Sequence, residues 1–144
     1  ARDVPAGQTR DYIFGYTILN DVSARDVQTA HKQWYFGKSL DGFTPIGPCI
    51  VTADAFADYP PRLGIRSFVN GEKRQDSNTA LQIFDIDHVI AELSQGMTLK
   101  AGTIIATGTP AGVGMGMDPP QFLKPGDVVR CEIDGIGTLT NPVN

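Results

Sequence analysis

Residues 64–76 read GIRSFVNGEKRQD, and this stretch decides the kind of fold that the chain adopts. Residues 64–69 mix apolar and polar side chains in the alternating manner of a strand. Asn70-Gly71 follows, and this dipeptide favours the tight two-residue turn that joins antiparallel strands. We therefore expect residues 73–76 to return antiparallel to residues 64–69.

The same reasoning predicts further strands on both sides of this hairpin. In residues 11–19 the alternation of Tyr12, Phe14, Tyr16 and Ile18 predicts one face of a strand. The remaining predicted strands are residues 49–52, 103–107, 127–133 and 137–140, the last two forming a second hairpin. The expected fold is therefore α+β and mainly β, with a few short helices.

Two segments have helical patterns. Residues 24–32 follow Ser23, which is placed to cap the helix while Asp26, three residues later, reaches back. Residues 85–95 put apolar side chains on one face, and Gly96 follows as a stop. The apolar positions of this second helix are Ile86, Val89, Ile90 and Leu93.

Composition narrows the class of protein. The chain has 144 residues, 41% of them hydrophobic and 19% charged, which predicts one globular domain over residues 1–144. Its net charge of −4 and its lack of basic clusters argue against a nucleic-acid or anionic membrane partner. Cys49 and Cys131 are far apart and form no motif, so we expect two buried thiols and a cytoplasmic protein.

The segment after residue 19 carries the first candidate chemistry. Asp21, Arg25 and Gln28 have the spacing of one helical face, with Asp21 at the end of the preceding strand. A carboxylate there suits Mg²⁺ or Ca²⁺, and Arg25 suits a substrate carboxylate. The alternative is that Asp21 caps the helix and that Arg25 is a solvated surface charge.

Two further segments carry candidate groups. Lys38, beside aromatic residues 34–36, can donate to an enolate or act as an acid or base, or it is an ordinary surface lysine. Thr109 opens a glycine-rich loop whose N–H groups and hydroxyl suit a carboxylate or keto oxygen, unless this is simply a long mobile loop. We expect His31 and His88 to be surface residues.

These segments, in this order, resemble the fumarylacetoacetate hydrolase family. The matching stretches are GYTILNDVSARD (residues 15–26), GKSLD (37–41), VNGE (69–72), TGTPAGVG (107–114) and FLKPGD (122–127). The resemblance runs along nearly the whole chain. It implies the layered, mixed β-sheet roll of that family's C-terminal domain, in a homodimer.

The resemblance also implies roles for the five candidate residues. Asp21 would be one of three carboxylate ligands of Mg²⁺, with Ca²⁺ or Mn²⁺ as alternatives. Arg25 and Gln28 would contact a small keto acid substrate, Lys38 would support the reacting enolate, and Thr109 would bind a substrate carboxylate or carbonyl. A metal held in this way withdraws charge from the carbonyl of a 2-keto acid.

The chain departs from the family pattern in two places. The Glu-x-Glu pair that supplies the other two metal ligands is absent, so we expect it to lie upstream of Ala1. Gly42 stands where the hydrolase that gives the family its name has a hydroxyl residue, so contacts there do not transfer.

Three functions remain open. The first expectation is a metal-dependent hydrolase that cleaves a C–C bond of acylpyruvate-type substrates. The alternatives are an isomerase or decarboxylase of 2-hydroxydienoic acids in aromatic-acid catabolism, such as a 2-hydroxyhepta-2,4-diene-1,7-dioate isomerase, or a non-catalytic fragment of the same fold.

Overall fold

A four-stranded antiparallel sheet forms around the predicted hairpin. Strands β3 (Gly64–Val69) and β4 (Glu72–Asn78) are joined at Asn70-Gly71, whose φ angles are 51° and 85°. Positive φ at both positions is what a two-residue hairpin turn requires. The second predicted hairpin, β5 (Val128–Ile133) and β6 (Gly137–Pro142), completes a sheet of order β4-β3-β5-β6.

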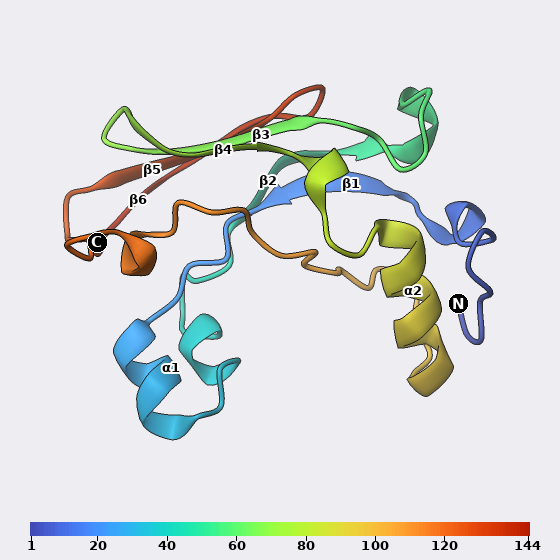
Figure 1. Ribbon diagram of the computed structural model, residues 1–144, viewed down its shortest axis with the longest axis horizontal. Helices are drawn as coiled ribbons and strands as arrows, with labels where there is room; N and C mark the ends of the chain where they lie inside the picture. Colours follow the sequence, from blue (N-terminus) through green and yellow to red (C-terminus); the bar gives the residue numbers. More distant parts are fainter.

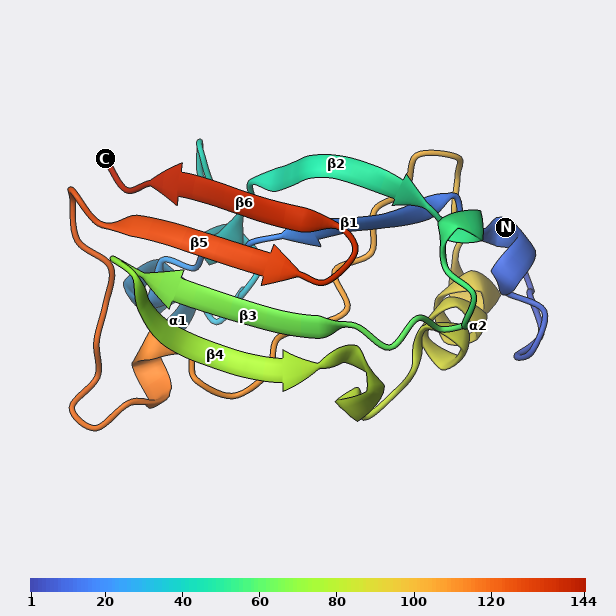
Figure 2. The ribbon, with the colours of Figure 1, turned by 90° about the horizontal axis from the view of Figure 1, so that it is seen from above.

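A second, two-stranded sheet carries the segment that leads to the candidate site. Strands β1 (Gly15–Leu19) and β2 (Ile46–Thr52) pair antiparallel, and β2 lies alongside β6 (Figure 2). Helices α1 (Arg25–His31) and α2 (Ile86–Gly96) lie on one side of the strands, at opposite ends of the molecule (Figure 1). Short 3-10 turns occupy residues 10–12, 36–38, 53–55, 79–81 and 114–116. The fold is mainly β with few short helices, as expected.

The computed structural model describes residues 1–144, with every side chain except that of His31. The expectation of a surface histidine at that position therefore lies outside the described residues, whereas His88 is exposed as expected. None of the helices in the described part of the chain is long and apolar enough to cross a bilayer.

The buried apolar core is small. It consists of Val4, Ile18, Ile90, Ala91, Val129 and Ile136. The N-terminal segment is fastened to α2 by hydrogen bonds from the N–H groups of Asp3 and Val4 to Ser94. The buried apolar residues therefore come from the N-terminal segment, β1, β5, the turn that follows β5, and α2, and none of them comes from α1.

The prediction of a strand over residues 103–107 is wrong. The segment is not paired with any strand of the described chain, and Figure 1 shows it beneath the sheet. β-branched residues favour an extended backbone, but a strand also requires a neighbour to accept and donate its hydrogen bonds.

The strand predicted over residues 11–19 is shorter than expected. Residues 10–12 form a 3-10 turn, and pairing begins at Gly15. Tyr12 and Phe14 are exposed, whereas Tyr16 packs edge-on against Phe56 and Ile18 is buried, so only the second half of the alternating face is covered.

Two smaller expectations are also corrected. Ser23 does not cap α1: the helix begins at Arg25, and the Ser23 hydroxyl donates instead to the carbonyl of Asp21. Both cysteines are free, but Cys49 is exposed, because it lies on β2 where that strand has no covering layer. Burial raises the pKa of the Cys131 thiol above its usual value.

Candidate functional site

Asp21 and Lys38 form an ion pair at the end of β1. The Lys38 Nζ group donates to Oδ2 of Asp21, and about a third of each side chain is exposed. Asp21 follows β1, where the Asn20 N–H donates to the carbonyl of Pro45. The two residues are 17 positions apart, so the fold brings together a carboxylate and an ammonium group that the sequence places in separate motifs.

The close packing of Gly37 explains why Lys38 reaches Asp21. An added Cβ at Gly37 would lie 2.8 Å from the carbonyl oxygen of Ala24 and 2.9 Å from Cβ of Gln28. The N–H of Ala24 donates to the Gly37 carbonyl at 2.8 Å. Glycine therefore lets the 3-10 turn Phe36–Lys38 lie directly on the first turn of α1, and Lys38 is carried with it.

Arg25 and Gln28 form a second pair on the first turns of α1. An Arg25 guanidinium N–H donates to Oε1 of Gln28 at 2.9 Å. Gln28 is buried and Arg25 is half-buried. The Arg25 guanidinium is therefore held in place by Gln28 and does not lie free in solvent. Planar, fixed guanidinium groups are well suited to bind a carboxylate through two parallel hydrogen bonds.

Thr109 is held by β4 rather than by α1. The side-chain amide Nε2 of Gln75 donates to the Thr109 hydroxyl at 2.8 Å and to the Pro110 carbonyl at 2.9 Å. Ser67 on β3, the direct cross-strand neighbour of Gln75, donates its hydroxyl to Oε1 of Gln75 at 2.8 Å. Gln75 was not among the residues that the sequence pointed to, and only its pairing with Ser67 across the hairpin could have indicated it.

The structure thus assembles the predicted site residues in two groups. Asp21, Lys38, Arg25 and Gln28 gather around the start of α1. Among the described side chains, no hydrogen bond or ion pair joins this group to Thr109. Asp21 neither caps α1 nor lies free in solvent, because its carboxylate is paired with Lys38.

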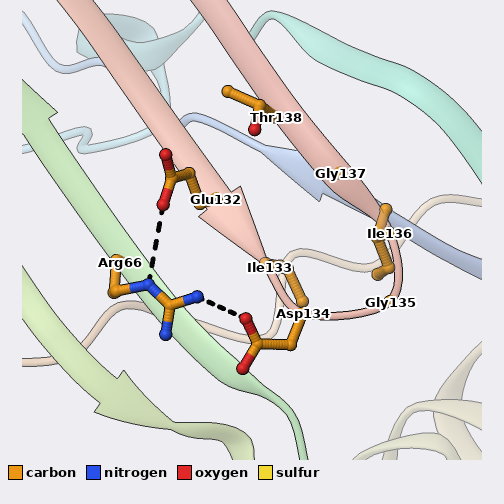
Figure 3. Close-up of a pocket in the computed structure, with 8 residues that line it drawn as sticks. All are labelled: Arg66, Glu132, Ile133, Asp134, Gly135, Ile136, Gly137 and Thr138. Atoms are coloured by element: carbon orange, nitrogen blue, oxygen red, sulfur yellow. Dashed lines mark hydrogen bonds and ion pairs between the residues drawn. The ribbon is translucent and has the colours of Figure 1, made fainter.

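An open hollow in the surface lies elsewhere. It has a volume of about 540 Å³ and lies at the turn between β5 and β6 (Figure 3). Arg66 in this cavity is paired with Asp134, and its Nε lies 3.6 Å from the Glu132 carboxylate. Glu132 is also paired with Arg130 at 3.2 Å, so both carboxylates have a cationic partner, and none of the predicted site residues lines the cavity.

The residues present do not make a metal centre by themselves. Among the described side chains, which exclude only His31, no group of three or more His, Cys, Asp or Glu residues is placed to hold a metal ion. Asp21 is a single carboxylate and already has Lys38 as its partner. A lone carboxylate binds Mg²⁺ weakly, because this ion retains most of its water.

The sequence of the chain matches one family profile and is similar to characterised proteins. The family profile "Fumarylacetoacetate (FAA) hydrolase C-terminal" matches residues 1–144. Oxaloacetate tautomerase YisK of Bacillus subtilis is 52% identical over 133 residues, which are 92% of this chain and 44% of that protein.

Solved structures agree with this relationship. The fumarylacetoacetate hydrolase of psychrophilic Exiguobacterium antarcticum superimposes with a TM-score of 0.96 and 51% identity, over 100% of this chain and 51% of that one. The 2-hydroxyhepta-2,4-diene-1,7-dioate isomerase of Mycobacterium marinum has a TM-score of 0.86 and 47% identity, over 99% of this chain and 52% of its own. The chain spans about half the length of the relatives that it matches.

Proposed function

Because the chain belongs to the fumarylacetoacetate hydrolase family, we propose that it forms part of an enzyme that interconverts the keto and enol forms of small 2-keto acids. The observation that carries this proposal is the 52% identity with an oxaloacetate tautomerase over 92% of the chain. A relative named as a dienedioate isomerase supports the same class of reaction. Both names favour isomerisation over the C–C bond hydrolysis that we first expected.

The residues around α1 suit the chemistry of a keto–enol exchange. Such an exchange removes a proton from the carbon next to the carbonyl and delivers a proton to the carbonyl oxygen, or the reverse. We propose that Arg25, held by Gln28, binds the carboxylate of the acid through paired hydrogen bonds. Lys38 would donate a hydrogen bond to the oxygen on which negative charge develops, and Asp21 keeps its ammonium group in position.

Thr109 completes the proposed set. Its hydroxyl is exposed and fixed from behind by Gln75, so it can bind a second oxygen of the substrate. Its place on a different segment from α1 is typical of sites assembled from several loops on a rigid scaffold.

We further propose that Asp21 is one ligand of a divalent cation, Mg²⁺ or alternatively Ca²⁺ or Mn²⁺, whose other ligands lie outside residues 1–144. The absence of a Glu-x-Glu pair from the sequence agrees with this division. In this arrangement residues 1–144 form the C-terminal part of the catalytic unit, and two copies form a homodimer.

The test is a kinetic assay on residues 1–144 and on the form that the gene encodes with its upstream sequence. The enol of oxaloacetate absorbs in the ultraviolet, so its conversion is followed directly, and pyruvate release is measured in parallel. We expect accelerated loss of the enol without pyruvate release, in the longer form only and only with the cation. Pyruvate release would instead support decarboxylation, cleavage of acylpyruvates would support hydrolysis, and inactivity on all of them would contradict the proposal.

A further inference from the structure

We propose that Gln75 is a positioning residue that fixes the Thr109 hydroxyl as a hydrogen-bond donor toward the substrate. This inference rests on the proposed function, because it assigns a direction to the hydrogen bond by which Thr109 would hold the acid. It adds a residue on β4, supported by Ser67 on β3, to the groups around α1.

The hydrogen-bond partners determine which way the Gln75 amide points. The Pro110 carbonyl can only accept, so the atom 2.9 Å from it must be the NH₂ end of the amide. The Oε1 end then accepts the hydroxyl hydrogen of Ser67 at 2.8 Å. Both ends of the amide therefore have partners that agree on one orientation, and a flipped amide would set two acceptors against each other at Pro110.

This orientation also determines what Thr109 does. One Nε2 hydrogen points to the Pro110 carbonyl, and the other is left for the Thr109 oxygen at 2.8 Å. Because Nε2 has no lone pair to offer, the Thr109 oxygen must accept this bond. The hydroxyl hydrogen of Thr109 is then free to point away from β4, where an oxygen of a carboxylate or enolate can receive it.

A β-bulge in β4 places the supporting residues. Ser67 pairs with Gln75 and Phe68 pairs with Lys73, which leaves Arg74 as the extra residue. Bulges redirect side chains and are frequent beside active sites. Adjacent residues of a regular strand point to opposite faces, but here Arg74 and Gln75 both contact residues 109–121. Arg74 donates to the Gln121 side chain, and Gln75 donates to the Thr109 hydroxyl and to the Pro110 carbonyl.

Gly112 allows the same loop to approach the backbone of β4 closely. Gly112 has a φ of 107°, and an added Cβ would lie 2.1 Å from the Arg74 carbonyl oxygen. The backbone on both sides of Pro110 is therefore fixed at β4, and Thr109 has little freedom to compensate for a lost contact. For this reason, a change confined to the Gln75 amide should alter the orientation of the Thr109 hydroxyl.

The decisive variant is Gln75→Glu, made in the form of the protein that shows tautomerase activity. An ionised carboxylate keeps the shape of the side chain but can only accept, so the Thr109 hydroxyl turns its hydrogen back toward β4. We expect kcat/KM for oxaloacetate to fall by about tenfold to a hundredfold at neutral pH. The loss should shrink as the pH falls, because a protonated carboxyl group regains a donor.

A double-mutant cycle with Thr109→Val separates positioning from a merely structural role. If Gln75 acts through the Thr109 hydroxyl, Gln75→Glu should cost little further activity once that hydroxyl is gone. Ser67→Ala removes the hydrogen bond to Oε1 but leaves the Pro110 carbonyl to orient the amide, so it should give a smaller loss of the same kind. Gln95→Glu, an exposed position on α2, is the matched control and should retain wild-type kinetics.

The outcomes are distinct. If the unmodified protein is inactive on 2-keto acids, the proposed function fails and this inference fails with it. If it is active and Gln75→Glu has control-like kinetics, only the inference is overturned. A loss that is independent of pH, or undiminished in the Thr109→Val background, also overturns it. Circular dichroism of each variant identifies unfolding, and in that case the Ser67→Ala result decides.

Discussion

At the scale of single residues, Asp21 is the group on which the proposed chemistry depends most. Its carboxylate is partly exposed and makes one side-chain contact that the structure records, the ion pair with Lys38. Such a pair contributes only about 0–1 kcal/mol to stability when it is open to solvent. The residue can therefore be changed for its chemistry without a large effect on the fold.

We predict that Asp21→Asn abolishes cation-dependent tautomerase activity while the free energy of unfolding changes by no more than about 1 kcal/mol. The amide is a poor ligand for a divalent cation and leaves Lys38 without its counter-charge. Enol consumption and urea denaturation measure the two quantities. Asp26→Asn, an exposed acid on the first turn of α1, is the control, and full activity in Asp21→Asn would remove that residue from the site.

Asp87 illustrates a structural rather than a catalytic carboxylate. It accepts the hydroxyl hydrogen of Thr9 at 2.6 Å and the N–H of Gly7, so it ties the N-terminal segment to α2. The hydrogen bond from Thr9, with a smaller contribution from the Gly7 N–H, holds the pKa of Asp87 below its usual value despite partial burial. Thr9 is fully buried and also contacts the Tyr59 hydroxyl.

We predict that Asp87→Asn lowers the free energy of unfolding by about 1–3 kcal/mol at neutral pH, because its single amide oxygen can accept from only one of the two donors that the carboxylate serves. A lowered folded-state pKa stabilises the protein above the unfolded value of about 3.9 and ceases to do so as the pH falls through the folded value. The difference between wild type and variant should therefore shrink below about pH 4. Urea titrations at several pH values check this, with Glu92→Gln on the same helix as control; a pH-independent difference would contradict it.

At the scale of elements, Gly37 determines whether the turn that carries Lys38 can lie against the start of α1. The turn that carries Lys38 lies so close to α1 that an added Cβ at residue 37 would press on the Ala24 carbonyl and on Gln28. Both neighbours are parts of the helix start, and neither is the flexible end of a long side chain. The turn itself must therefore move if residue 37 becomes larger.

We predict that Gly37→Ala separates Lys38 from Asp21 and lowers kcat/KM by at least about tenfold, with a loss of about 1–3 kcal/mol in stability from overpacking. Gly96→Ala is the matched control, because nothing lies within 4 Å of its added Cβ at the end of α2. It should be neutral or slightly stabilising. Equal activity in the two variants would show that the close approach at Gly37 is not required.

The elements also show where sequence patterns suffice and where they do not. The Asn70-Gly71 turn and helix α2 were predictable because local patterns specify them: both turn residues have positive φ, and the apolar side chains of α2 repeat at helical spacing. The structure adds that the Asp85 side chain caps α2 by accepting the N–H of His88. The strand expected over residues 103–107 failed because pairing depends on a distant neighbour. The Gln75–Thr109 contact likewise depends on the bulge at Arg74, for which the sequence carries no local pattern.

At the scale of the whole molecule, the solvent-accessible surface area is larger than expected for a folded monomer of this mass. A folded monomer of 15.5 kDa is expected to expose about 7,200 Å² of accessible surface. Residues 1–144 expose 9444 Å². Large apolar side chains contribute to this surface at both ends of the molecule; among them are Phe14, Trp34, Tyr35, Ile83 and Phe84.

We predict that residues 1–144, expressed by themselves, associate in solution and bind a hydrophobic dye such as ANS. The excess of about 2,200 Å² is more than a standard protein–protein interface buries in total, so its exposure to water is costly.

Equilibrium sedimentation at several concentrations should show mass increasing with concentration. If the proposed homodimer forms, the form with its upstream sequence should bind less dye and sediment as a defined dimer, because its additional residues and its second copy would cover the same surface. Trp34→Ser should weaken association of the short form, whereas Lys100→Ser, an exposed polar position, should not. A short form that stays monomeric and dye-free would mean that this surface is stable in water and that the homodimer needs another explanation.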